Sequence, residues 1–130
     1  MVRCDGEQRP ETQAQATILL VEDEVLVRMM MADKLRDAGY VVIEATNGEE
    51  ALQVLHHSSV HVRLIISDVK MPGAIDGLAL AREVRSDYPL IKIVLTSGHL
   101  SAHKSQEHDG FFAKPYDPAT IIGHIKTLLE

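Results

Sequence analysis

Residues 64–73 read LIISDVKMPG, and this stretch decides the fold expected for the chain. Its first three residues, at 64–66, are apolar and partly β-branched, which is typical of a strand buried on both faces. The run stops at Ser67 and Asp68, and a loop that contains the sequence MPG follows. A buried strand that ends abruptly in polar residues predicts one unit of a parallel sheet.

Similar apolar runs lie on both sides of this stretch and alternate with amphipathic segments. Strands are expected at 18–21, 40–45, 64–66, 91–95 and 111–113, and helices at 25–39, 47–55, 77–88 and 118–128. Regular alternation of strand and helix, with right-handed crossovers, predicts an α/β fold. We expect a doubly wound, five-stranded parallel sheet with helices on both faces.

The helix expected at 25–39 has apolar residues at spacings of three and four, which predict a face turned toward the sheet. These residues are Val25, Met29, Ala32 and Leu35. Gly39 is expected to end the helix, because glycine readily takes the left-handed conformation found at helix ends. Asn47 and Glu50 have the spacing of a helix cap, so the next helix is expected to begin there.

Length and charge exclude several classes of protein. The chain has 130 residues, 13 Lys and Arg against 19 Asp and Glu, and a formal net charge of −6. This length fits one domain, expected at 17–130, after a flexible polar tail at 1–16. The acidic balance argues against direct nucleic-acid binding, and no apolar run is long enough for membrane insertion. Because the lone Cys4 cannot form an internal disulfide, we expect a cytoplasmic protein.

Polar side chains gather where the expected strands end. They are Glu22 and Asp23 after the first strand, Asp68 after the third, Thr96 after the fourth and Lys114 after the fifth. Ligands of doubly wound sheets bind beside these ends. Three neighbouring carboxylates repel each other, and a hard divalent ion such as Mg²⁺ would join them. A carboxylate beside Mg²⁺ can attack phosphorus to give an acyl phosphate, while an ammonium group and a hydroxyl bind the phosphoryl oxygens.

Four motifs carry a resemblance to a known family. LLVEDE begins at Leu19, IISDVKMPG at Ile65, VLTSG at Val94 and FFAKP at Phe111. In this order and spacing they resemble the receiver domain of two-component response regulators, over residues 17–129. The resemblance implies a flavodoxin-like fold and a phosphoacceptor signalling module, which takes a phosphoryl group from a histidine kinase onto an aspartate.

The resemblance also assigns a phosphorylation and metal site. Asp68 matches the phosphoacceptor, and Glu22 and Asp23 match the acidic pair that holds Mg²⁺ together with Asp68. The main-chain carbonyl of Lys70 is implied as a further ligand. Mg²⁺ is therefore the expected cofactor.

A second group of matches concerns the conformational switch. Thr96 matches the switch hydroxyl, and Lys114 matches the lysine that contacts the phosphoryl group. Phe111 occupies the position of the switch aromatic residue. The resemblance also implies a cis peptide bond between Lys114 and Pro115, which proline allows.

The sequence departs from the family pattern in three places. The loop at 71–77 carries one residue more than the common spacing, which should reshape the loop without moving Asp68. The segment at 98–110 is short and mostly polar, so the fourth helix, between the fourth and fifth strands, should be shortened or irregular. Phe111 replaces the frequent tyrosine, which leaves a purely apolar switch.

Two alternative functions stay open beside the phosphoacceptor. A phosphatase of the haloacid dehalogenase type also uses an aspartate nucleophile and Mg²⁺, but it needs a second aspartate where this chain has Lys70. A receiver that no longer accepts phosphate would act only as a binding module, and the presence of Asp68, Thr96 and Lys114 argues against that. We expect a phosphoacceptor that is not an enzyme.

The partners implied by the resemblance are proteins. A sensor histidine kinase or a histidine phosphotransfer protein would donate the phosphoryl group, and the downstream protein partner is unknown. The chain ends at Glu130, directly after the last expected helix. We therefore expect either a stand-alone receiver or a receiver cut from a longer protein such as a hybrid kinase.

Overall fold

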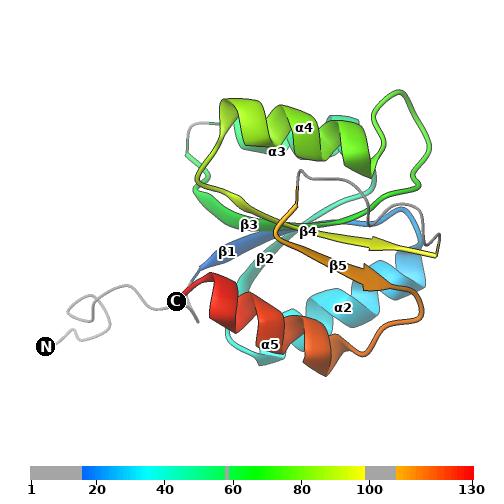
Figure 1. Cartoon of the computed structure of the whole chain (residues 1–130), viewed down its shortest axis with the longest axis vertical. Coiled ribbons are helices and arrows are strands. Elements are labelled where there is room, and N and C mark those ends of the chain that lie inside the picture. The colour runs from blue at the N-terminus through cyan, green and yellow to red at the C-terminus, as the bar shows by residue number, and fades with distance from the viewer. Residues whose placement is uncertain (1–15, 58, 99–107) are drawn as a thin grey trace, which may run out of the picture.

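The five strands form one parallel sheet (Figure 1). The computed structural model describes residues 16–57, 59–98 and 108–130. The strands are β1 (Thr17–Val21), β2 (Val41–Ala45), β3 (Val62–Asp68), β4 (Lys92–Ser97) and β5 (Gly110–Ala113). Their order is β2-β1-β3-β4-β5, so the chain first moves from β1 to one edge and then reverses toward the other. This reversal confirms the doubly wound, flavodoxin-like topology.

Helices cover both faces of the sheet in the described part of the chain. They are α2 (Val25–Asp37), α3 (Gly48–His56), α4 (Gly77–Asp87) and α5 (Pro118–Leu128). Figure 1 shows α3 and α4 on one face and α2 and α5 on the other. The shortened helix expected between β4 and β5 falls mostly on 99–107, which lie outside the described residues.

Two apolar cores fill the space between the sheet and its helices. Alternate residues of the central strands point to opposite faces, so Leu19 and Ile65 pack under α3 and α4, whereas Ile18 and Ile66 pack under α2 and α5. All four side chains are buried. The near-continuous apolar runs of β1 and β3 are therefore explained by burial on both faces.

The face of α2 that contacts the sheet agrees with the expected one at Ala32 and Leu35 but differs from it nearer the start of the helix. Val25 and Met29 are 55% and 52% exposed, and the buried residues are Met31, Ala32 and Leu35. The sequence VLVRMMM at 25–31 is apolar on almost every side of the helix, so spacing alone does not determine its rotation. Packing against the sheet selects the stripe through Met31 and Leu35.

Caps and turns fix the helix ends as the sequence indicates. Gly39 follows α2 with a φ of 101°, and the Asn47 side chain accepts a 2.8 Å hydrogen bond from the Glu50 amide at the start of α3. Ala16, the last residue of the expected tail, is buried, and its carbonyl accepts a hydrogen bond from the Val41 amide. The rest of that tail lies outside the described residues.

Candidate functional site

The carboxyl ends of β1, β3 and β4 meet at one edge of the sheet. Val21 pairs with Ser67 across β1 and β3, and Asp68 pairs with Thr96 across β3 and β4. This register brings the polar residues that end each strand into one place. Glu22, Asp68 and Thr96 are all buried there, with exposures of 3%, 7% and 2%.

Three carboxylates form a cluster that suits a hard cation. Glu22, Asp23 and Asp68 each offer an oxygen, and the three oxygens lie within 4.8 Å of one another. Burial raises the pKa of the Asp68 carboxyl above its usual 3.8, and burial likewise raises the pKa of Glu22 above 4.5. A cluster of carboxylate oxygens fits Mg²⁺ better than a soft metal ion.

Lys114 supplies positive charge to the same cluster. Its Nζ donates a 2.9 Å hydrogen bond to Glu22 Oε1 and a 3.2 Å bond to Asp68 Oδ2, and it lies 3.8 Å from Glu24 Oε1. Burial alone would lower the pKa of Lys114, but its hydrogen bond to Glu22 and the negative charges of Asp68 and Glu22 outweigh burial and raise it above 10.5. Lys114 is therefore held as an ammonium ion between two buried carboxylates.

The backbone around Lys114 and Asp68 is fixed by the neighbouring strands. The Lys114 amide donates to the Ser97 carbonyl at 2.8 Å, and the Lys114–Pro115 peptide bond is cis, as the resemblance implies. The Val69 amide donates to the Thr96 carbonyl at 2.8 Å. These bonds join β3, β4 and β5 where the polar side chains emerge.

The loop after Asp68 packs closely against the strand end. A Cβ atom at Gly77 would lie 2.3 Å from the Asp68 carbonyl oxygen, so a side chain there would displace the backbone. Lys70 lines an open cleft of about 630 Å³ beside the acidic cluster, together with Asp23 and loop residues 71–74. The longer loop also contacts α3, because the Ala74 amide donates to the Glu49 carboxylate at 3.0 Å.

The two expected switch residues lie on neighbouring strands. Thr96 is buried at the end of β4. Phe111 is half-buried in β5, packs against the core under α3 and α4, and has its ring 6.2 Å from that of His108. Residues 99–107, which come directly before His108, lie outside the described residues.

Three residues near the site were not anticipated from the sequence. Glu24 donates its amide to Glu22 Oε2 at 3.1 Å, Tyr116 has its pKa raised by burial, and the Arg28 guanidinium binds the Glu22 carbonyl. In the sequence, the signal for these three residues was that they lie close to Glu22 or Lys114. It was too general, because adjacency does not say which way a side chain points.

Comparison with known proteins decides the family. Residues 18–126 match the response regulator receiver domain. The chain belongs to this family. It is a receiver domain of the two-component type, and such domains are in general signalling modules that accept phosphoryl groups and interact with histidine kinases. The phosphatase and pure binding-module alternatives are not favoured.

Two relatives that the chain matches are much longer than the chain itself. The chain is 36% identical to the sensor kinase CckA of Brucella abortus over 129 residues, which are 95% of the chain and 14% of that protein. It is 32% identical to the transcriptional regulatory protein BaeR of Escherichia coli, over 87% of the chain and 48% of that protein. The chain thus spans less than half of either relative.

Solved receiver structures agree with the fold. The response regulator TrrA of Thermotoga maritima, determined in complex with Mg²⁺ and BeF, has a TM-score of 0.80 and 31% identity, and the match covers 88% of this chain and all of that one. The receiver domain of the hybrid histidine kinase CckA has a TM-score of 0.75 and 37% identity, with the same coverage. Within the described residues, no helix has the length and apolar character needed to cross a membrane.

Proposed function

We propose that this receiver domain, at residues 17–130, accepts one phosphoryl group on Asp68 in the presence of Mg²⁺. The observation that carries the proposal is the position of the Asp68 carboxylate. It is 7% exposed, 3.2 Å from the Lys114 ammonium, and within 4.8 Å of Glu22 and Asp23 oxygens. A carboxylate beside both a cation site and an ammonium group is arranged to attack phosphorus.

The transfer step is a displacement at phosphorus. A carboxylate oxygen of Asp68 forms a bond to the phosphorus of a phosphohistidine, the P–N bond breaks, and the histidine nitrogen leaves with the electron pair. Lys114 stabilises the negative charge on the phosphoryl oxygens. Glu22, Asp23, Asp68 and the main-chain carbonyl of Lys70 would hold Mg²⁺, which supplies further charge neutralisation when bound.

We propose that the phosphoryl donor is a sensor histidine kinase or a histidine phosphotransfer protein, and that the transfer takes place in the cytoplasm. An exposed apolar surface on α2, formed by Val25, Leu26, Met29 and Met30, supports a protein donor. Met30 also lines a cleft with Lys114 and Tyr116, so this surface borders the phosphorylation site. Exposed apolar patches of this kind are typical of protein interfaces.

The conformational output is proposed to run through Thr96 and Phe111. Phosphoryl oxygens on Asp68 would accept a charge-assisted hydrogen bond from the Thr96 hydroxyl. Asp68 and Thr96 are direct register partners, so the two residues lie side by side at the ends of β3 and β4. Leu95 pairs with Phe111 in the adjacent register, which links movement of β4 to the position of the aromatic ring.

Intact-mass measurement after incubation with acetyl phosphate and Mg²⁺ tests the phosphoacceptor. We expect one added phosphoryl group in the wild type and none in Asp68→Asn. Asp76→Asn is the matched control, because Asp76 caps α4 through the Ala79 amide and asparagine can also cap. An adduct that persists in Asp68→Asn would refute the proposal. Release of inorganic phosphate in many turnovers would favour the phosphatase instead.

A further inference from the structure

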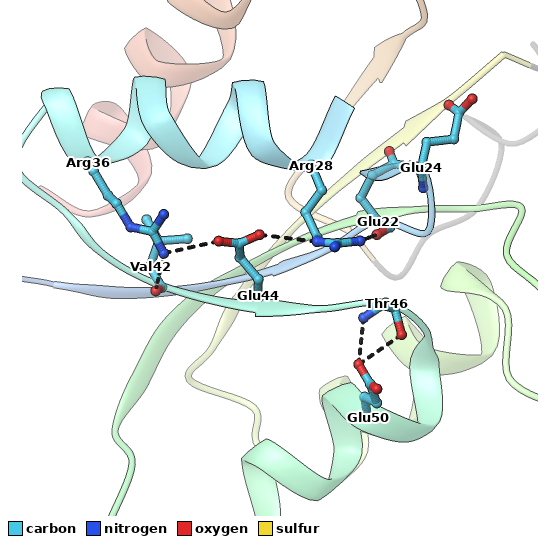
Figure 2. A network of polar contacts seen from close by, with 8 residues as sticks. All are labelled: Glu22, Glu24, Arg28, Arg36, Val42, Glu44, Thr46 and Glu50. Carbon is cyan, nitrogen blue, oxygen red and sulfur yellow. Dashed lines mark hydrogen bonds and ion pairs between the residues drawn. The ribbon is translucent and has the colours of Figure 1, made fainter. Parts of the chain in front are cut away.

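Every polar group of Glu22 is engaged by a different neighbour. Its amide donates to the Ala45 carbonyl at 3.0 Å, and its two carboxylate oxygens accept from Glu24 N and Lys114 Nζ. The main-chain carbonyl accepts a 2.8 Å hydrogen bond from Nη1 of Arg28, in α2 (Figure 2). Glu22, the first residue of the acidic turn Glu22-Asp23-Glu24, is therefore held by its backbone as well as by its side chain.

The Arg28 guanidinium is itself oriented by a carboxylate on β2. Nε of Arg28 donates to Glu44 Oε1 at 3.1 Å, and the Arg28 side chain is only 14% exposed. The other oxygen of Glu44 accepts from Arg36 Nη2 at 3.2 Å, and Arg36 also donates to the Val42 carbonyl. Figure 2 shows Glu44 lying between the two arginines, with Arg28 on the side of Glu22.

We infer that Arg28 is a positioning residue for the acidic turn Glu22-Asp23-Glu24, and that Glu44 sets the orientation of its guanidinium. The inference rests on the proposed function, because it concerns the same cation site. It adds Arg28, which is not among the residues proposed to hold Mg²⁺ or to bind the phosphoryl group. Arg28 acts through the backbone of Glu22.

The planarity of the peptide bond explains how a carbonyl contact can position a metal ligand. The carbonyl of Glu22 and the amide of Asp23 belong to one rigid peptide unit. A hydrogen bond that fixes the carbonyl therefore fixes the plane from which the Asp23 side chain emerges. Groups behind the direct ligands commonly control metal affinity in this way.

Charge and geometry predict opposite effects for the loss of Arg28. Removing a positive charge near three carboxylates would by Coulomb's law make Mg²⁺ bind more tightly. Releasing the Glu22 carbonyl would let the turn move, and Mg²⁺ would bind more weakly. Lysine keeps the charge but donates from one nitrogen, so it loses the fixed fork by which separate nitrogens of the guanidinium reach Glu22 and Glu44.

Calorimetric titration with Mg²⁺ separates these effects. We expect Arg28→Ala to weaken Mg²⁺ binding by about tenfold, the usual scale for second-layer groups of metal sites. Arg28→Lys should weaken it at least as much, because it loses the fork and keeps the charge that opposes the cation. Arg36→Ala is the matched control, because it removes the same charge and a bond to Glu44 but leaves the Glu22 carbonyl bound. Unchanged or tighter binding in Arg28→Ala would overturn the inference.

Hydrogen exchange in metal-free protein provides a readout that does not depend on Mg²⁺. We expect faster exchange of the Glu24 amide, which donates to Glu22 Oε2, in Arg28→Ala and Arg28→Lys than in Arg36→Ala. Equal exchange in all three variants would also overturn the inference. Failure of the wild type to bind Mg²⁺ or accept a phosphoryl group would instead refute the proposed function, and the exchange comparison would still decide the role of Arg28.

Discussion

Lys114 Nζ lies 3.2 Å from Asp68 Oδ2, although 46 residues separate them in the sequence. The strand order explains the contact, because β4 alone lies between β3 and β5. The same ammonium reaches Glu22, at the end of β1, at 2.9 Å. Lys114 thus joins the ends of three strands and offsets the charge of two buried carboxylates.

Removing this ammonium should destabilise the metal-free protein. We expect Lys114→Met to lower the free energy of unfolding by about 2 kcal/mol, less than for a fully buried ion pair, because the Lys114 side chain keeps 20% exposure. Mg²⁺ should restore much of the loss, since it can replace the missing positive charge. Urea unfolding with and without Mg²⁺ measures both effects. An equal loss in Lys126→Met, on the exposed part of α5, would contradict the explanation.

The raised pKa of Asp68 predicts a pH-dependent stability. A carboxyl whose pKa is raised by folding stabilises the protein below its unfolded value, here 3.8, and this contribution is lost as the pH rises through the raised value. Asp68→Asn should therefore gain stability over the wild type as the pH rises from 3.8 through the raised pKa of Asp68, reaching about 1 kcal/mol, a common scale for one substitution.

Thermal unfolding across this pH range, without Mg²⁺, measures the difference between Asp68→Asn and the wild type. Saturating Mg²⁺ should reduce or reverse it, because the ion binds the folded wild type more tightly than the variant. A difference that stays constant with pH would show that the Asp68 carboxyl is not the group responsible.

Gly77 should be intolerant of any side chain. A Cβ there would lie 2.3 Å from the Asp68 carbonyl oxygen and 2.7 Å from Val69 Cα, so Gly77→Ala must shift the backbone that carries the phosphoacceptor. We expect a loss of about 3 kcal/mol in unfolding free energy, the scale of a severe steric substitution, and slower phosphorylation by acetyl phosphate.

Gly123 in α5 offers the matched control for this substitution. Among the described residues, and apart from the adjoining backbone of α5 itself, a Cβ at Gly123 would meet no atom within 4 Å. Gly123→Ala should therefore stabilise the protein by up to about 1 kcal/mol, through the higher helix propensity of alanine. Similar effects of Gly77→Ala and Gly123→Ala on stability and phosphorylation would be incompatible with the close contact at Asp68.

The proposed switch predicts where the protein responds to a phosphoryl group. Beryllofluoride with Mg²⁺ should change hydrogen exchange most at the end of β4 and in β5, and Thr96→Ala should lose this change. Phe111 is already half-buried, so further burial is worth about 1 kcal/mol, or about a fivefold change in population. If the largest change in hydrogen exchange lay in α3 instead, the conformational change would not pass through Thr96 and Phe111.

Much of the fold could be predicted because its signals are local. The apolar runs of the strands, the Asn47 cap and Gly39 each depend on a few neighbouring residues, and all appear in the structure. The rotation of α2 could be predicted only in part, since Ala32 and Leu35 are buried as expected but Val25 and Met29 are exposed. Its apolar residues surround the helix, so only contact with the sheet decides that Met31 is buried and Met29 is exposed.

The sequence by itself determined which chemical groups end each strand, and hence that carboxylates, a hydroxyl and an ammonium group would meet at one edge. Only the tertiary structure decided how they are held. The hydrogen bond from Arg28 to the Glu22 carbonyl, the orientation of Arg28 by Glu44 and the reach of Lys114 to Asp68 all join different elements. Such contacts depend on strand order, register and helix rotation, and these are set by the packing of both cores together rather than by any local run of residues.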